Sequence, residues 1–220
     1  MINQGITNKT NQEGDKKLVF TVKERCRVCY TCVRECPAKA IRIAGGQAEV
    51  IASRCIACGN CIKVCSQDAK IFLKEIDQVS RLIATYPKVI AMVAPSFPAE
   101  FGDYSDYRVL VGLIKSFGFS HVTEVSFGAD LVARYYKEQL NLDLPAISSD
   151  CPAIVSYIER YSPELSNKLA PVVSPMVAMA RVLRKHYGDD AKLVFIGPCL
   201  AKKAESDEID AALTFRELRE

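Results

Sequence analysis

The chain of 220 residues is long enough for one sizeable domain or two small ones. Its hydrophobic content of 49% and charged content of 25% are those of a soluble globular protein, and a formal net charge of +3 is too small to indicate a nucleic-acid partner. No run of about 18 apolar residues occurs, so the sequence predicts no membrane-spanning segment.

The first 16 residues are polar and contain no apolar stretch of the kind found in a signal peptide, so we expect a disordered tail at 1–16. Ten cysteines without a secretion signal indicate a reducing compartment, where thiolates stay free to bind metal. The sequence therefore predicts a cytoplasmic protein.

Residues 17–76 are predicted to form a small cysteine-rich α+β domain. Short strands are expected at 17–24, 40–44, 48–52 and 69–73, and a brief helix is expected at the end of each cysteine-rich loop. A region of about 60 residues is too small to bury a large core, so we expect bound metal to stabilise it.

Two cysteine runs of one spacing dominate this region, and the second begins 29 residues after the first. The runs are Cys26, Cys29, Cys32 and Cys36, then Cys55, Cys58, Cys61 and Cys65. This spacing is typical of two [4Fe–4S] clusters, in which each run gives three thiolates to one cluster and its fourth to the other. One cluster would take Cys26, Cys29, Cys32 and Cys65, and the other would take Cys55, Cys58, Cys61 and Cys36.

Two other interpretations of the cysteines are a disulfide framework and a pair of zinc sites. Zinc sites usually combine two cysteine pairs across a longer gap, whereas each run here holds three cysteines and a fourth, which favours the clusters. Basic residues gather around the first run: Arg25, Arg27, Arg34, Lys39 and Arg42. They either compensate the negative charge of the clusters or form a docking patch for an acidic redox carrier.

Residues 77–220 are predicted to form an α/β lobe with a parallel sheet. Nearly continuous apolar runs predict strands at 88–94, 121–125, 144–148 and 192–197, and amphipathic stretches predict helices at 75–85, 105–117, 128–141, 152–161 and 175–187. Alternation of this kind indicates a parallel sheet covered by helices on both faces, with ligands at the carboxyl ends of the strands.

The two remaining cysteines lie at such strand-to-helix turns. Cys151 precedes Pro152 and a predicted helix, and Cys199 follows Pro198, with Lys202 and Lys203 one turn further on. A helix N-terminus and nearby lysines favour the thiolate form, which suits a metal ligand. On composition alone, two buried and inert cysteines are an equal alternative.

Four motifs give the chain its resemblance to a known family. Residues 148–152 (SSDCP) are similar to the TSCCP signature of [FeFe]-hydrogenase large subunits, and Pro198, Cys199, Lys202 and Glu205 match the signature PCxxKxxE. The stretches APSFPAEF at 94–101 and FGAD at 127–130 also resemble that family. With the cysteine region, which resembles a two-cluster ferredoxin, the similarity covers roughly residues 18–220.

The resemblance implies a site for the H-cluster, a [4Fe–4S] cluster joined to a two-iron unit that carries carbon monoxide, cyanide and a dithiolate. It implies that Cys151 and Cys199 are two of the four cluster ligands and that Lys202 donates a hydrogen bond to a cyanide. Asp150, Lys202 and Glu205 are then the predicted catalytic residues. The implied reaction interconverts protons, electrons and dihydrogen, with a carrier such as ferredoxin as redox partner and the hydrogenase maturation machinery supplying the two-iron unit.

The sequence departs from the family pattern at several places. The first cysteine of TSCCP, which carries protons in the family, is Asp150, and Tyr135 and Tyr136 stand near the expected glutamates. Ile154 and Gly197 replace an aromatic residue and a methionine. The third family motif, ExMxCxGGCxxGGG, does not occur, so we expect the chain to be part of a longer protein.

These departures favour a sensory, low-turnover member of the family as the first hypothesis. Such a protein would bind hydrogen and report through a C-terminal signalling domain of the PAS type. A turnover hydrogenase is the second hypothesis. The third is a protein without enzymatic activity, either a [4Fe–4S] electron carrier or an iron–sulfur assembly factor.

Overall fold

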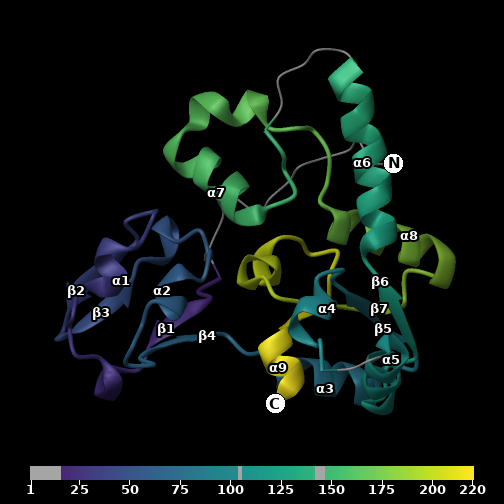
Figure 1. Ribbon diagram of the computed structural model, residues 1–220, viewed down its shortest axis with the longest axis horizontal. Coiled ribbons are helices and arrows are strands. Elements are labelled where there is room, and N and C mark those ends of the chain that lie inside the picture. Colours follow the sequence, from purple (N-terminus) through teal and green to yellow (C-terminus); the bar gives the residue numbers. More distant parts are fainter. Residues whose placement is uncertain (1–15, 104–105, 142–146) are drawn as a thin grey trace.

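The computed structural model describes residues 16–103, 106–141 and 147–220, so most of the predicted tail at 1–16 lies outside the described residues. Two parts lie side by side in Figure 1, a small cysteine-rich part in purple and blue and a larger α/β lobe in teal, green and yellow. We call residues 17–76 the cysteine module and residues 77–220 the lobe.

The cysteine module is built from two antiparallel strand pairs. The first and last strands pair with each other, and the two middle strands pair across the turn at Gly45 and Gly46, both of which have positive φ angles. The strands are β1 Val19–Thr21, β2 Ile41–Ala44, β3 Gln47–Val50 and β4 Lys70–Phe72; the short helices are η1 Lys23–Arg25, α1 Thr31–Arg34, η2 Ala52–Arg54 and α2 Asn60–Lys63. The predicted strands and brief helices of this region are confirmed.

The lobe contains a four-stranded parallel sheet in the order β6-β5-β7-β8. Its strands are β5 Val89–Val93, β6 His121–Glu124, β7 Lys192–Gly197 and β8 Ala211–Thr214. Its helices are α3 Ile76–Thr85, α4 Phe97–Glu100, α5 Tyr107–Ser116, α6 Ser126–Asn141, α7 Pro152–Tyr161, η3 Pro163–Lys168, α8 Pro175–Tyr187, η4 Leu200–Ala204 and α9 Phe215–Arg219.

Helices cover both faces of this sheet. Every residue of the inner strand β5 is buried, which requires cover on each face. The chain crosses from β5 to β6 through α5, then back over β5 to β7 through α6 and α8. Because parallel crossovers are right-handed, these opposite directions place α5 on one face and α8 on the other. The predicted α/β lobe is therefore confirmed.

Local sequence explains how the lobe's helices begin and how closely they pack. Ser174 caps α8 by accepting a hydrogen bond from the backbone N–H of Val177, and Pro175 occupies the first helical position, where a missing N–H costs nothing. Gly128 lets α6 lie directly against α8, because a Cβ there would come within 2.2 Å of the Pro175 carbonyl oxygen.

One strand of the sheet differs from the prediction. The fourth strand is β8 at Ala211–Thr214, a short run that the apolar pattern did not mark as a strand. Residues 144–146 of the strand predicted at 144–148 lie outside the described residues, and Ile147 forms only an isolated parallel bridge with Leu169. Cys151 therefore does not follow a strand of the four-stranded sheet, whereas Cys199 does follow β7.

A buried ion network ties the end of the cysteine module to the last elements of the lobe. The Nζ of Lys203 lies 2.9 Å from a carboxylate oxygen of Glu217 and 3.8 Å from one of Glu75, and the side chains of Lys203 and Glu217 are fully buried. Glu75 and Glu217 also accept hydrogen bonds from the backbone N–H groups of Ala212 and Thr214. Burial acts to raise the pKa of Glu217, but hydrogen bonds from the backbone N–H groups of Thr214 and Glu75 and from Lys203 outweigh it and lower the pKa. The ionised network therefore stabilises the fold above the ordinary glutamate pKa, and that contribution is lost as the pH falls through the lowered value.

Among the described residues, no helix is both long enough and apolar enough to cross a membrane.

We predict that Lys203→Met lowers the free energy of unfolding by about 3–5 kcal/mol, because it leaves the buried carboxylate of Glu217 without its cation, whereas Glu75 keeps its ion pair with Lys16. Urea unfolding followed by far-ultraviolet circular dichroism measures this loss. Lys74→Met is the matched control, since the Lys74–Glu220 ion pair is exposed and is worth about 0–1 kcal/mol. Equal losses in the two variants would contradict the prediction.

Candidate functional site

The two cysteine loops share one unusual backbone conformation. Val28 and Tyr30 of the first loop have φ angles of 52° and 63°, and Ala57 and Gly59, 29 residues later, have 55° and 78°. A positive φ is strained for residues other than glycine, above all for a β-branched valine. The same strained path at equivalent positions is typical of loops that wrap a ligand.

Backbone N–H groups in the module point at cysteine sulfurs. The N–H of Ala40 donates to Cys36 Sγ at 3.3 Å, that of Ala57 donates to Cys55 Sγ at 3.4 Å, and that of Ala48 donates to Cys26 Sγ at 3.5 Å. Donors aimed at sulfur stabilise thiolates and tune the potential of any cluster the thiolates hold.

The structure brings together the two crossed sets of four cysteines that the sequence predicts. Burial raises the pKa of the Cys32 thiol, and the neighbours that raise it further are Cys65, Cys29 and Cys26. Burial likewise raises the pKa of Cys61 to about 12, with a further rise from Cys55, Cys58 and Cys36. Each run therefore has the last cysteine of the other run beside it.

A small cavity lies among the cysteines of the second set. Cys36, Cys55, Cys58 and Cys61 line it together with apolar side chains, among them Val19 and Ile56. Four sulfurs around one apolar cavity, with N–H donors behind two of them, fit a four-iron cluster, which needs one thiolate for each iron.

The two cysteines of the lobe lie on neighbouring turns. Cys151 is the N-cap residue of α7 and is exposed, while Cys199 is the N-cap residue of η4 and is half-buried. Neither thiol is fully buried, which does not match the alternative of two buried, inert cysteines. Helices α7 and η4 pack together, and Lys202 Nζ donates a hydrogen bond to the carbonyl of Asp150 at 3.1 Å. The two signature motifs, distant in sequence, are thus in contact.

Lys202 and Glu205 form a nearly buried ion pair beside these turns. Lys202 Nζ lies 2.7 Å from Glu205 Oε2, and their side chains are 11% and 7% exposed. No described residue donates an aligned hydrogen bond to that carboxylate oxygen, so its contact with Lys202 is an ion pair. Glu205 thereby holds the ammonium group of Lys202 next to the Cys151 turn.

Asp150 belongs to a small hydrogen-bonded group rather than to an open surface. Its carboxylate accepts a hydrogen bond from Ser148 Oγ at 2.9 Å, and the hydroxyl of Tyr136 lies 3.4 Å from its other oxygen. Tyr136 in turn accepts from the backbone N–H of Ser149 at 3.0 Å. Tyr136, on α6, is therefore brought to Asp150, whereas Tyr135 is buried in the core of the lobe.

Gly197 is required by close packing at the end of β7. A Cβ at this position would lie 2.5 Å from the ring of Phe195 and 2.9 Å from the Cβ of Ala94. A methionine, which the family signature carries here, would therefore not fit without movement of both neighbours.

Helix α7 carries two contacts with the cysteine module that sequence reasoning missed. The Nη1 of Arg160 lies 2.8 Å from the carbonyl oxygen of Ser53 and 3.2 Å from that of Cys55. The hydroxyl of Tyr161 lies 2.7 Å from the carbonyl oxygen of Arg54. In sequence, a basic residue and a tyrosine near a helix end look like any solvated face, so no signal marked them.

The first turns of α7 and η4 share an apolar cluster with the cysteine module. Ala153, Leu200 and Ala201 are buried together with Cys32 and Cys36, and Cys199 packs against the same cluster. The lobe cysteines are therefore connected to the cysteine module by continuous packing.

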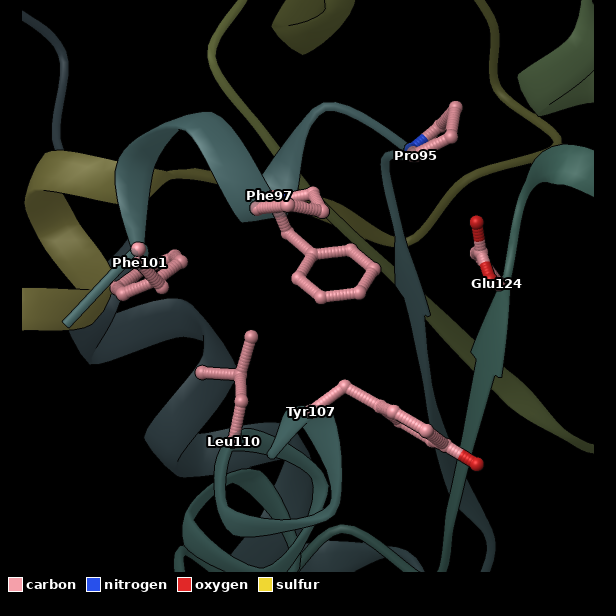
Figure 2. Close-up of a pocket in the computed structure, with 8 residues that line it drawn as sticks. Pro95, Phe97, Phe101, Tyr107, Leu110 and Glu124 are labelled. Carbon is pink, nitrogen blue, oxygen red and sulfur yellow. The ribbon is translucent and has the colours of Figure 1, made fainter. Parts of the chain in front are cut away.

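A separate pocket lies at the carboxyl ends of β5 and β6, between α4 and α5. It has a volume of about 380 Å³, and Figure 2 shows the ring of Phe97 pointing into it, with Leu110 and Tyr107 below and Glu124 at its edge. None of the predicted site residues lines this pocket.

Comparison with known proteins agrees with this arrangement. The family model described as "iron only hydrogenase large subunit, C-terminal domain" matches residues 87–220, and the model of the 4Fe-4S dicluster domain matches residues 18–66.

Several curated proteins are similar to the chain. The NADP-reducing hydrogenase subunit HndD of Solidesulfovibrio fructosivorans is 28% identical, over 74% of this chain and 34% of that protein. The periplasmic [Fe] hydrogenase large subunit of Nitratidesulfovibrio vulgaris is 31% identical, over 88% of this chain and 55% of that protein. The cytosolic Fe-S cluster assembly factor NAR1 of Debaryomyces hansenii is 24% identical, over 78% of this chain and 38% of that protein. The chain thus spans about a third to a half of the length of these relatives.

The dicluster match shows that the cysteine module is an iron–sulfur module, and the hydrogenase match covers more than half of the chain. The family resemblance is thereby confirmed, and the chain belongs to the iron-only hydrogenase large-subunit family.

Proposed function

We propose that the cysteine module delivers electrons to a hydrogenase-type site built around Cys151 and Cys199. Helix α7 is the observation that carries this proposal. It begins at Cys151, and Arg160 and Tyr161 at its other end contact the loop of the second cysteine run. A helix of ten residues is about 15 Å long, so α7 supports a short connection between the two sites.

The two crossed sets of cysteines would hold one [4Fe–4S] cluster each. Bound there, the clusters supply one-electron transfer. The chain's own residues aim N–H donors at the sulfurs and surround the second set with apolar side chains that exclude water.

The position of α7 supports an order in which electrons pass through the two cysteine sets. The set of Cys55, Cys58, Cys61 and Cys36 lies next to the lobe, because α7 contacts the Cys55 loop and also the carbonyl of Ala38, two residues after Cys36. The first run carries the exposed basic side chains of Arg25, Arg27 and Arg34. We infer that an acidic carrier such as ferredoxin docks there, since opposite charges steer association.

In the lobe, Cys151 and Cys199 would be two of the ligands of an H-cluster. The N-terminal turns of α7 and η4 present the two cysteines, and the Lys202–Glu205 ion pair places an ammonium donor beside them. An ammonium group is a compact, fully charged donor, which suits an anionic diatomic ligand such as cyanide. The hydrogenase maturation machinery is the expected source of the two-iron unit.

We further propose that the protein turns over hydrogen slowly and acts as a sensor. Asp150 supports this proposal, because its carboxylate is hydrogen-bonded to Ser148 and faces Tyr136 at the position where the family carries a proton-transferring cysteine. A carboxylic acid is a much stronger acid than a thiol, so an aspartate is in general a poorer proton donor than a cysteine near neutral pH. Output through a PAS-like domain and a cytoplasmic location stay predictions, and one relative is named as periplasmic.

An iron–sulfur assembly role is the second candidate. The similarity to NAR1 assembly factors from several organisms, at 24–27% identity, favours it. Hydrogen chemistry discriminates the two candidates, because an assembly factor needs no two-iron unit and evolves no hydrogen after exposure to the maturation machinery.

The ligand assignment predicts about eight irons in the reconstituted chain, since each of two clusters holds four. Cys36→Ala and Cys55→Ala, although in different runs, should remove the same cluster and leave about four irons, singly or combined. Cys26→Ala combined with Cys36→Ala, although both lie in one run, should remove both clusters. Iron analysis and cluster absorbance measure these contents. If the Cys26/Cys36 double variant kept about four irons, the crossed assignment would be wrong.

The sensor proposal predicts that Asp150→Cys raises hydrogen evolution by the matured protein by about 10²-fold, because a positioned proton donor contributes about 10²–10⁴-fold. Gas chromatography with reduced ferredoxin as donor measures the rate. Ser148→Cys is the matched control, since it places a thiol two residues away and keeps the Asp150 carboxylate, although it removes the hydroxyl that donates a hydrogen bond to that carboxylate. A native rate already equal to that of Asp150→Cys would refute the low-turnover role.

A further inference from the structure

A buried lysine breaks the internal symmetry of the cysteine module. The repeat of 29 residues maps Ile41 onto Lys70, and Lys70 is as buried as its apolar equivalent, with 4% exposure against 6%. The same repeat maps Thr21 onto Val50. In the strand pairs, Ile41 lies opposite Val50, and Lys70 lies opposite Thr21. A polar pair therefore replaces an apolar pair at one of two equivalent places.

The ammonium group of Lys70 is hydrogen-bonded but not paired with an acid. Its Nζ donates to Thr21 Oγ1 at 2.6 Å and to the carbonyl oxygen of Ala48 at 2.7 Å. Among the described residues, no carboxylate lies within ion-pair distance of it. Buried charges are costly unless an opposite charge compensates them, so the module needs a negative group near Lys70.

Lys70 lies between the two sets of cysteines. Helix α2, which carries Cys61, packs against β4, which carries Lys70. The charge of Lys70 acts on both the Cys32 and the Cys61 sulfur atoms. Cys32 belongs to the first set and Cys61 to the second. Ala48, which accepts a hydrogen bond from Lys70, also donates its N–H to Cys26 Sγ at 3.5 Å.

We propose that Lys70 is the internal counter-cation of both clusters and that it raises their reduction potentials together. This inference rests on the proposed placement of the two clusters. Four thiolates make each cluster anionic, and reduction adds a further negative charge. A positive charge held in a low-dielectric interior favours the more negative state, and it acts on both clusters because it is close to both. This shared positive charge thereby makes both clusters easier to reduce.

The test is Lys70→Met in the 220-residue chain, with each cluster titrated by electron paramagnetic resonance at controlled potentials. Methionine is unbranched and apolar, so it suits the place where the other half of the module has Ile41. We expect the equilibrium constant for reduction to fall about tenfold for both clusters, which is about 59 mV for a one-electron couple. Lys70→Gln, which keeps a hydrogen-bond donor without the charge, should lower both potentials as well.

Two controls separate charge from packing. Lys63→Met removes an exposed lysine of the same module, and solvent screening should keep both potentials within measurement error of the native values. Thr21→Val removes a hydrogen-bond partner of Lys70 and keeps its charge, so the potentials should move much less than in Lys70→Met.

The outcomes also separate this inference from the proposed function. Two clusters with native potentials in both Lys70→Met and Lys70→Gln would overturn the role of Lys70 and leave the electron-transfer role standing. An equally large fall of both potentials in Lys63→Met would also overturn it, because removal of any positive charge from the module would then have the same effect. A native chain that binds no clusters would overturn both proposals.

Discussion

The crossed placement of Cys36 and Cys65 is the constraint on which the cysteine module depends. Each loop places three cysteines close together through left-handed backbone positions at Val28 and Tyr30 or at Ala57 and Gly59. The fourth cysteine of each set comes from the other loop, so neither set is complete without the other. The module has a small apolar core, and this exchange links its two loops. Loss of Cys36 or Cys65 from one loop leaves the set of the other loop incomplete.

Helix α7 and the buried ion network extend this dependence into the lobe. The helix presents Cys151 at one end and contacts the second cysteine loop through Arg160 and Tyr161 at the other. The network of Lys203, Glu217 and Glu75 joins the segment that leaves the cysteine module to the last strand and helix. Because the ions are buried, they are compensated only in one arrangement of these elements, which favours a single geometry between the cysteine module and the lobe.

The two halves of the module are equivalent in backbone and different in surroundings. Their strand pairs, left-handed positions and cysteine spacing repeat after 29 residues. Helix α7 contacts the second loop and also the carbonyl of Ala38, which follows the first cysteine run, and only the second half carries Lys70 in place of an apolar residue. A symmetric scaffold thus surrounds its two cysteine sets with different neighbours.

Much of this fold could be predicted from sequence. The strands and short helices of the module, strands β5, β6 and β7 of the lobe and its five main helices could be predicted. They follow from the spacing of apolar residues and from turn residues, which act locally. The fourth strand, β8, was missed because Ala211–Thr214 is short and contains two alanines and a single β-branched residue, Thr214. It is held as a strand by its partner β7 and by the network around Glu217 rather than by its own preference.

The sequence by itself determined the kind of cofactor and the family, because cysteine spacing within a loop decides which metal centre the loop can wrap. Only the tertiary structure decided which cysteine set faces the lobe, that Tyr136 meets Asp150, and that Lys70 lies between the two sets. These facts depend on contacts between residues far apart in the chain and on which side chains lose their access to water. Neither the local period nor the composition contains that information, since the same lysine is ordinary on a surface and exceptional in a core.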